Sequence, residues 1–518
     1  MAEWLRELGS PPPHVLLLAA VTLAVVLLRY AIWKHDPREP PLISGAPVLG
    51  HLPGIYHHGT SYPVVLSAQT DQLPIYAVYL LGQKIYTVNA GEIASLLSRK
   101  NKQLDAETGF IVVVFQNMLG VDKSTMKTLV STPKSGQKGQ RTPYRDDMRT
   151  TEHRLLAPGE SNRQFYVKIM NAFVQVLDDM MTSNTNSIHL MKWLEELYTR
   201  VAGVGMYGKE SPFETRPSLI WDYWLWDSNM SPFLLNFFPK YTAPEAFEAR
   251  ERLVDVLKGC IADTHDDDKE EDGQVNVISR KRRDISIKHS LSADYLGRSE
   301  LELLNGLLSN TVPAVFWMLA HTLAGSFFGS IKEEVGRFVQ AEGNQLQFDI
   351  SQVRTQCPTL VATYQESLRL YASSARAYKV VQDFELMDGC LLKKGNLVYV
   401  PTETIHRNPK NWGPDVLEFK PERWIKSECD HHPGSYAPFG VGSSICPGRH
   451  FVFDMILGSL VVLLYSLDIE LAPGTDVEVP KTRLKVMSGV RLPVCDLGVV
   501  LKRKTLGESG SEITKWAF

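Results

Sequence analysis

Phe439-Gly440-Val441-Gly442-Ser443-Ser444-Ile445-Cys446-Pro447-Gly448-Arg449 is the most informative stretch of this chain, because it presents one cysteine at the start of a predicted helix. Pro447 has no N–H and its φ is preset for a first helical turn, so we expect Cys446 at the N-cap. A thiolate there faces unpaired backbone N–H groups and the positive end of the helix dipole, which lower the pKa of a thiol. Gly442 and Gly448 carry no Cβ, so a flat, bulky cofactor can approach the backbone closely.

This arrangement suits a thiolate that donates axially to haem iron and favours O–O cleavage. The alternative is a buried structural cysteine in a glycine-rich turn. For an isolated cysteine the structural alternative would be preferred. Here Pro447 and the surrounding glycines favour the haem ligand instead.

Four motifs carry a resemblance to the cytochrome P450 family. They are the cysteine loop, Glu366-Ser367-Leu368-Arg369, Phe419-Lys420-Pro421-Glu422-Arg423-Trp424, and His406-Arg407-Asn408-Pro409 followed by Trp412-Gly413-Pro414-Asp415. Their order and spacing are those of the family, over roughly residues 40 to 500. The resemblance implies haem b ligated by Cys446, with Phe439, Gly442 and Gly448 around it. It also implies a mainly α fold with a smaller β-rich part.

Length and composition favour one large enzyme domain. The chain has 518 residues, is 44% hydrophobic and carries a net charge of −3. No Pro-rich or Gly/Ser-rich linker follows residue 60, and the charge gives no argument for a nucleic-acid partner. The cysteines show no CxxC spacing, which fits a reducing compartment. We expect an anchor at 1–33, a charged Pro-rich connector at 34–54, a haem-thiolate domain at 55–505 and a polar tail at 506–518.

The N-terminal apolar run predicts a membrane anchor. Residues 15–28 are uninterrupted and apolar, and residues 30–33 extend them past Arg29 to the roughly 20 residues that a bilayer span needs. Lys34 and Arg38 follow it, so the positive-inside rule puts the main domain in the cytosol. A cleaved signal peptide is the alternative, but no small-residue cleavage site follows. We expect a single-pass anchor in the endoplasmic reticulum membrane.

Several other segments carry simpler expectations. Residues 75–88 alternate like a β-hairpin, and residues 121–152 read as a long polar loop leading into a helix. The acidic run 263–272 and the basic run 280–283 read as a solvated surface loop. Residues 300–328 read as one long helix interrupted by Pro313, and residues 451–467 as a buried core helix.

Glu366 and Arg369 lie three residues apart on one helix face. Such a pair is ordinarily an exposed one of small energetic value. The resemblance implies instead that it is buried and joined by Arg423, with a structural role, and an Arg fork can bind Glu bidentately.

The long helix raises the question of how oxygen is handled. The family usually has an acid followed by Thr here, whereas this chain has Asn310, Thr311 and Pro313 with no acid. Pro313 crowds the carbonyl of Ser309 and predicts a kink; its polar neighbours could simply cap the freed backbone. The pattern resembles the branch with the sterol hydroxylases of bile-acid synthesis and prostacyclin synthase. Asn310 and Thr311 favour hydroxylation, and the missing acid leaves a peroxide isomerase open.

Candidates for the haem propionates are less clear. Ser444 stands where the family usually has Arg or His, and the usual Trp-x-x-x-Arg pattern is absent. Alignment of residues 153–156 with the family's Arg-Arg-Leu-Leu puts Arg149 and His153 at the Trp and Arg positions. His153 or Arg154 could hold a propionate, and so could Lys379 or Arg376. A solvated histidine is the alternative.

The segments that line the family's pocket are apolar here. They are residues 108–115, 223–226, 233, 237–238 and 486–490. They favour a lipophilic substrate such as a terpenoid, sterol or fatty-acid derivative, although apolar runs also make ordinary cores. With no nucleotide-binding or flavin motif in the chain, the resemblance implies electrons from a separate NADPH-dependent flavoprotein reductase. The sequence thus predicts a membrane-anchored haem-thiolate monooxygenase.

Overall fold

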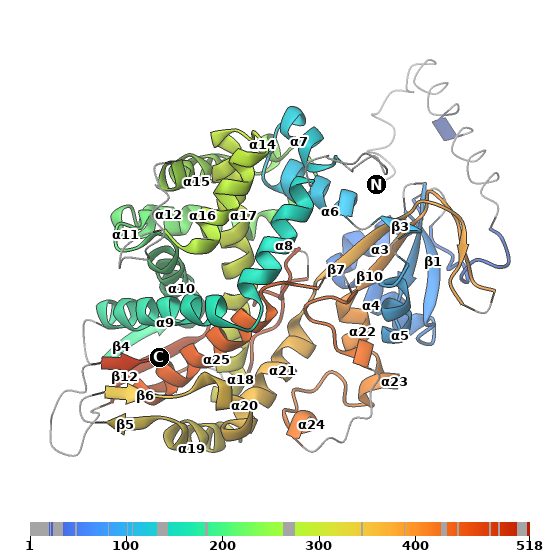
Figure 1. Ribbon diagram of the computed structural model, residues 1–518. Helices are drawn as coiled ribbons and strands as arrows, with labels where there is room; N and C mark the ends of the chain where they lie inside the picture. Colours follow the sequence, from blue (N-terminus) through green and yellow to red (C-terminus); the bar gives the residue numbers. More distant parts are fainter. Residues whose placement is uncertain are drawn as a thin grey trace, which may run out of the picture.

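The β-rich side of the molecule is built on a five-stranded mixed sheet in the order β1-β2-β10-β7-β3 (Figure 1). Its strands are β1 Ile75–Leu80, β2 Gln83–Val88, β10 Leu397–Pro401, β7 Ala375–Val380 and β3 Leu104–Asp105. β2 and β10 run parallel and the other pairs are antiparallel. The predicted hairpin at 75–88 is confirmed, with Ile75 opposite Val88. Gly82 supplies a φ of 89° beside its turn, which suits glycine.

This computed structural model describes residues 20, 22–23, 35–46, 49–80, 82–100, 102–105, 107–131, 143–181, 185–262, 275–342, 345–387, 389–425, 433–442, 445–475, 478–484, 487–504 and 515–518. Three smaller sheets complete the strands. They are β11 Leu467–Leu471 with β12 Gly498–Arg503 and β4 Thr185–His189; β13 Lys515–Ala517 with β6 Gln345–Gln347 and β5 Gln340–Glu342; and β8 Phe384–Glu385 with β9 Leu391–Leu392.

Helices make up the rest of the described chain. The first half contains α3 Leu52–His58, α4 Tyr62–Gln69, α5 Gly91–Leu97, α6 Glu107–Ile111, α7 Lys123–Leu129, α8 Tyr144–Leu156, α9 Glu160–Met180, α10 Leu190–Tyr207, α11 Pro212–Thr215, α12 Ser218–Ser228, α13 Met230–Leu234, α14 Pro239–Thr242 and α15 Pro244–Ala262. The second half contains α16 Val277–Lys288, α17 Ala293–Leu308, α18 Thr311–Ala324, α19 Phe328–Phe338, α20 Val353–Gln356, α21 Pro358–Tyr371, α22 Thr402–His406, α23 Pro409–Trp412, α24 Glu422–Ile425 and α25 Arg449–Ser466. Short turns η1 Gly59–Ser61, η3 Ile350–Gln352 and η4 Pro433–Ser435 and the π-helical η2 Val112–Met118 connect them.

The centre of the fold is formed by α18, α21 and α25, which pack on one another and on α9 and α10 (Figure 1). α25 is apolar on nearly all sides and is buried, as predicted for residues 451–467. Glu334 of α19 accepts the N–H groups of Thr359 and Leu360, which satisfies donors in the first turn of α21. These helices and the mixed sheet belong to one mainly α domain.

Aromatic stacking joins α18 to α21 and to the segment before α24. The rings of Trp317 and Tyr371 stack with centroids 4.0 Å apart, and His321 stacks on Phe419 at 3.7 Å. His321 Nε2 also lies 2.6 Å from the Tyr371 hydroxyl. Burial lowers the pKa of His321 to about 3, so its ring stays neutral between its partners. These contacts hold α18, α21 and the segment before α24 together.

Three expectations about the chain need correction. The predicted loop at 121–152 contains α7, where Asp122 accepts the N–H groups of Ser124 and Thr125 as an N-cap. The basic run lies on α16 and is not simply solvated: Arg282 is buried and bonds to Glu152, Glu302 and Ser299, because the matching acids lie on neighbouring helices. The acidic run 263–272 lies outside the described residues.

The third correction concerns the long helix. It begins at Ala293 rather than Glu300, breaks at residues 309–310 and ends at Ala324. Ser292 caps its start through the Tyr295 N–H, a signal that the apolar pattern alone does not contain. The break follows from Pro313, which has no N–H to give to Ser309.

The predicted anchor, residues 1–33, lies outside the described residues apart from residues 20, 22 and 23. Among described residues, Ala293–Ala324 and Arg449–Ser466 are long and apolar enough to cross a membrane. Because 78% and 67% of their most apolar windows are buried in the protein, we interpret both as core helices.

Both ends of the domain are tied to its body. In the connector, the buried carboxylate of Glu39 accepts from Lys84 Nζ at 2.7 Å and from the Tyr86 hydroxyl at 2.5 Å. Near the C-terminus, β13 pairs with β6, and Trp516 packs beside Phe348.

Candidate active site

The cysteine loop is held by a backbone bond and by positive φ angles. Cys446 N donates to the Phe439 carbonyl at 3.0 Å, which closes the loop on itself. Gly442 has a φ of 69°, and a Cβ on it would lie 2.3 Å from the side chain of Ser98. Glycine is needed here for its backbone conformation and its approach to α5, and not only to admit a cofactor as the sequence suggested. Ser443 and Ser444 lie outside the described residues.

Cys446 does not occupy the N-cap. That position belongs to Gly448, because α25 begins at Arg449 and Pro447 lies in the turn before it. The backbone N–H groups of Gly448 and Arg449 nevertheless act to lower the pKa of the thiol. A Cβ on Gly448 would lie 3.9 Å from Sγ, an ordinary contact.

The pKa of the Cys446 thiol is raised, not lowered as the helix position had suggested. Burial is the main cause, and it outweighs the opposing N–H groups and the charge of Arg449. The helix terminus by itself would lower the pKa of the thiol, but desolvation, which no local sequence pattern shows, reverses the direction.

The break between α17 and α18 supplies the polar groups expected at residues 310 and 311. Asn310 is exposed, and its backbone carbonyl accepts from Ala314 N at 3.2 Å. The Thr311 hydroxyl is buried and has no hydrogen-bond partner among the described residues. A buried hydroxyl without a partner is uncommon and is a candidate for bonding a ligand or water. Leu307 and Leu308 share a small cavity of about 10 Å³ with Met455, which places the break beside α25.

The late turn predicted to line the pocket meets Asn310. A Cβ on Gly489 would lie 2.2 Å from Asn310 Oδ1, so the amide lies directly against this glycine. Two hydrogen bonds from Ser373 hold the turn in place. Ser373 N donates to the Gly489 carbonyl at 2.8 Å, and Ser373 Oγ donates to the Ser488 carbonyl at 2.8 Å. Asn310 is therefore held between the helix break and a braced turn.

Glu366, Arg369 and Arg423 come together in a fully enclosed cluster. Arg369 binds Glu366 with two parallel bonds of 2.8 Å, and Arg423 Nε lies 3.4 Å from Glu366 Oε1. Glu366 and Arg369 have no exposed surface, so this is not the exposed pair that spacing alone would suggest. Arg369 also donates to the carbonyls of His406, Val416 and Glu418. Such bonding makes the buried charges tolerable.

His406 extends this cluster to the cysteine loop. Ala437 N donates to His406 Nε2 at 2.9 Å, so Nδ1 carries the proton and donates to the Arg369 carbonyl at 3.1 Å. Burial, followed by the charge of Arg369, lowers the pKa of His406 to about 3, so the ring is neutral. The sequence motif contained His406, but only the fold shows this bridge.

The propionate candidates differ in their surroundings. His153 on α8 is half-buried, and burial together with the charges of Arg149 and Arg449 lowers its pKa. The charge of Arg449, at the start of α25, thus acts on His153, whereas Arg154 is exposed. On β7, Lys379 is exposed, and Arg376 is half-buried on the opposite face.

The apolar pocket segments split into core and surface. Four of the aromatic residues are buried in the main core cluster: Tyr223, Trp224, Trp226 and Phe233. This agrees with the alternative that these apolar runs form an ordinary core. Phe110, Phe237 and Phe238 are more than half exposed.

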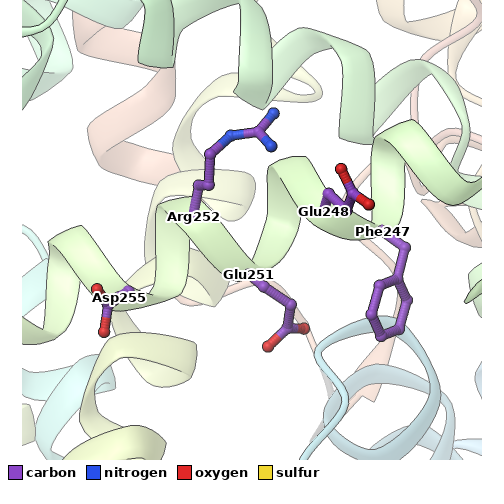
Figure 2. Close-up of a pocket in the computed structure, with 5 residues that line it drawn as sticks. All are labelled: Phe247, Glu248, Glu251, Arg252 and Asp255. Carbon is purple, nitrogen blue, oxygen red and sulfur yellow. The ribbon is translucent and has the colours of Figure 1, made fainter.

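A separate depression on α15 is not suited to a lipophilic ligand (Figure 2). It is lined by Phe247, Glu248, Glu251, Arg252 and Asp255. Arg252 is bound by Asp222 of α12 in two bonds of 2.6 and 3.0 Å, so the charge of this arginine is already paired.

A protein-family model described as Cytochrome P450 matches residues 40–493. The chain belongs to the cytochrome P450 family. Members of this family bind a thiolate-ligated haem, and this P450 is a haem-dependent monooxygenase. The residues present fit that group, with a cysteine at a helix start and a polar helix break beside the same helix.

Known P450s resemble the whole chain at low identity. Cytochrome P450 monooxygenase nodJ from Hypoxylon pulicicidum is 25% identical over 512 residues, covering 94% of this chain and 95% of the relative. Cytochrome P450 7B1 from Mus musculus is 24% identical, covering 90% and 92%. Cholesterol 7-alpha-monooxygenase from Cricetulus griseus is 27% identical, covering 53% and 57%. The solved structure of retinoic acid bound cyanobacterial CYP120A1 has a TM-score of 0.66 at 19% identity, covering 91% of this chain and all of that one.

Proposed function

We propose that this P450 inserts one oxygen atom of dioxygen into a lipophilic substrate of the terpenoid, sterol or related lipid class. The observation that carries the proposal is the cysteine loop, in which Cys446 N donates to the Phe439 carbonyl and the thiol lies just before the buried helix α25, beside the helix break.

Cys446 is the proposed axial ligand of the haem iron. The backbone N–H groups of Gly448 and Arg449 and the charge of Arg449 act to lower the thiol pKa, against the larger effect of burial. Phe439, Gly442 and Gly448 shape the loop around the ligand: Phe439 holds the backbone of Cys446, and Gly442 provides the turn. When bound, the haem supplies the binding and reductive activation of dioxygen.

Asn310 and Thr311 are the proposed polar residues of the oxygen side. The Thr311 hydroxyl is buried and free of partners among described residues, so it can bond to a bound molecule or to water. The side-chain amide of Asn310 lies at the helix break, directly against Gly489. Pro313 maintains the break that leaves room for both.

His153 is the proposed propionate partner, because it is half-buried and the charge of Arg449 beside the cysteine loop acts on it. The exposed Arg154 and Lys379 are weaker candidates. Glu366, Arg369 and Arg423 have a structural role: they hold the segment that His406 joins to the cysteine loop.

The substrate class rests on the apolar pocket segments and on the relatives. Phe110 and Val113 expose apolar surface on α6 and η2, before the buried part of that segment. One relative named above is a cholesterol 7-alpha-monooxygenase. A sterol or terpenoid of similar size is thus the first substrate class to examine.

The remaining partners are those that the family implies. P450s take electrons from a redox partner, and an NADPH-dependent flavoprotein reductase is the proposed donor here. The apolar run at 15–33 and the positive charges after it favour a single-pass anchor in the endoplasmic reticulum membrane, with the enzyme in the cytosol.

One observation keeps a second function in view. The helix break has no acidic residue at positions 309–311, and a peroxide isomerase needs neither electrons nor protons from outside. One measurement distinguishes the two functions: the rate of turnover with and without reductase and NADPH.

The deciding experiment loads the purified full-length chain with haem and adds a panel of sterols, terpenoids and fatty acids. We expect a lipophilic substrate to shift the haem spin state and then to be hydroxylated only with NADPH and a flavoprotein reductase. Conversion of an organic peroxide without reductase, together with no NADPH-dependent product, would support the isomerase instead.

A further inference from the structure

The last four residues of the chain return to the body of the domain as an extended segment. β13 Lys515–Ala517 pairs in parallel with β6, on the side of β6 away from β5, with Trp516 opposite Leu346. Figure 1 shows this end of the chain beside β6, α9 and α25. Residues 507–512, which precede it, read Gly-Glu-Ser-Gly-Ser-Glu and contain no apolar side chain. An aromatic strand thus follows a polar stretch of sequence.

Both aromatic rings of this segment contact the same ring of the domain. Trp516 and Phe518 lie two residues apart, on one face of the extended chain, and their rings are parallel with centroids 6.1 Å apart. Phe348, just after β6, meets the two rings edge to face at 5.9 Å and 5.7 Å. Such geometries are favourable for aromatic pairs. Lys515, by contrast, is exposed, so the contacts select the aromatic side chains.

The same two rings reach two helices of the central core. Trp516 meets Tyr465, in the last turn of α25, at 5.8 Å, and Phe518 meets Tyr166 of α9 at 6.5 Å. Tyr166 is buried, and its hydroxyl lies so close to α25 that a Cβ on Gly458 would be 2.5 Å from it. The end of the chain therefore spans the junction between α9 and α25.

This junction continues to the turn of α25 that follows the cysteine loop. Phe165, next to Tyr166, stacks on Phe451 with ring centroids 4.3 Å apart. Phe451 lies in the first turn of α25, five residues after Cys446. A segment that holds α9 against α25 thus supports the helix that follows the proposed ligand.

The edge of β6 away from β5 and the rings of Phe348, Tyr166 and Tyr465 together form what we call the β6 groove. We propose that the β6 groove is a peptide-binding site and that residues 515–518 occupy it in cis as a removable latch between α9 and α25. Pairing with the edge strand gives affinity, and aromatic side chains at alternate positions give specificity. Three register pairs hold the strand, few enough for local opening. The latch serves a monooxygenase and an isomerase alike, so it is independent of the proposed reaction.

The first test traps the latch in the full chain. Ala517 lies opposite Gln347 in the register, so Ala517→Cys with Gln347→Cys should form a disulfide on mild oxidation. The matched control is Ala517→Cys with Gln340→Cys, because Gln340 pairs with Gln347 and lies one strand further away. Peptide mapping by mass spectrometry identifies the bond, and the size of the product shows whether it joins one chain or two.

We expect a disulfide within one chain in the first pair and none in the control. A bond between two chains would show that the β6 groove takes the tail of a second copy, and no bond would show that residues 515–518 do not stay in it. Either result overturns the latch in cis.

The second test asks whether the β6 groove binds a peptide in trans. The full chain with Trp516→Ser and Phe518→Ser loses both rings of the latch, and Lys515→Ser, at an exposed side chain, is the matched control. The probe is a fluorescent peptide with the sequence of residues 511–518. Its binding is measured by fluorescence anisotropy, and the thermal midpoint of each protein is measured with and without it.

We expect saturable binding to the double variant and about tenfold weaker binding to wild type and Lys515→Ser, because the tethered latch competes at a high effective concentration. The double variant should unfold at a lower temperature than wild type, and saturating peptide should restore its midpoint. No saturable binding to the double variant, or equal binding to all three proteins, overturns the peptide site. The disulfide pattern decides the latch in cis even where the double variant fails to fold.

Discussion

The ring of His406 receives the backbone N–H of Ala437 at 2.9 Å and so connects the cysteine loop to the buried Glu366–Arg369 pair. The bridge depends on a neutral imidazole with its proton on Nδ1. It explains how a motif forty residues before Cys446 can affect the geometry of the ligand.

His406→Gln should loosen this bridge. One buried backbone group loses its partner at each end, which costs about 1–3 kcal/mol per group. We expect a lower thermal midpoint and faster haem loss to apomyoglobin. The exposed His57→Gln is the control and should leave both unchanged.

The same histidine sets a pH dependence. Its pKa is about 3 in the folded protein and near its ordinary 6.5 when unfolded, so the unfolded state binds the proton first as pH falls. The stability it contributes is complete above pH 6.5 and decreases between pH 6.5 and 3. Urea unfolding of wild type and His406→Gln at pH 5 and 7 checks this: the difference between them should be larger at pH 7.

Glu366→Gln should be among the most damaging conservative changes in the chain. It leaves Arg369 and Arg423 without their shared carboxylate, in a site with no solvent, and breaking such a buried pair costs about 3–5 kcal/mol. We expect little haem-loaded protein, measured as haem per chain. Glu422→Gln in the same motif is exposed and should load normally; equal loading of the two variants would contradict the role of the cluster.

Gly489→Ala tests the contact with Asn310. The new Cβ would lie 2.2 Å from Oδ1, so the amide must move, at an overpacking cost of about 1–3 kcal/mol. We expect a changed substrate-induced spin shift with haem still bound. Gly336→Ala on α19 meets nothing within 4 Å and should leave the spin shift as in wild type.

Thr311→Ala removes the unpartnered hydroxyl at the break. We expect roughly tenfold less product per NADPH oxidised, with more hydrogen peroxide, because the proton supply to oxygen is impaired. Product and peroxide are measured in the same reaction. Unchanged hydroxylation and coupling would show that this hydroxyl has no part in handling oxygen.

Much of the fold was predictable because its signals are local. The Pro313 break, the hairpin at 75–88 and the apolar helix after Cys446 follow from proline chemistry, alternation and composition. The start of the long helix lies seven residues before the one that apolar spacing predicts, because it depends on the Ser292 cap.

The site was less predictable because its decisive features are contacts between distant segments. The pKa of Cys446 depends on burial that no local pattern encodes. The bridge from His406 to Ala437 joins residues on separate elements, and a single sequence contains no signal for it.

Cys446→Ser gives the most direct test of the central claim, that this thiol is the ligand of the haem iron. The measurement is the ferrous–CO absorption spectrum of the purified full-length protein. The account predicts the red-shifted Soret band of thiolate ligation in wild type and its complete loss in Cys446→Ser. Absence of that band from wild type, or its survival in the variant, would contradict the account.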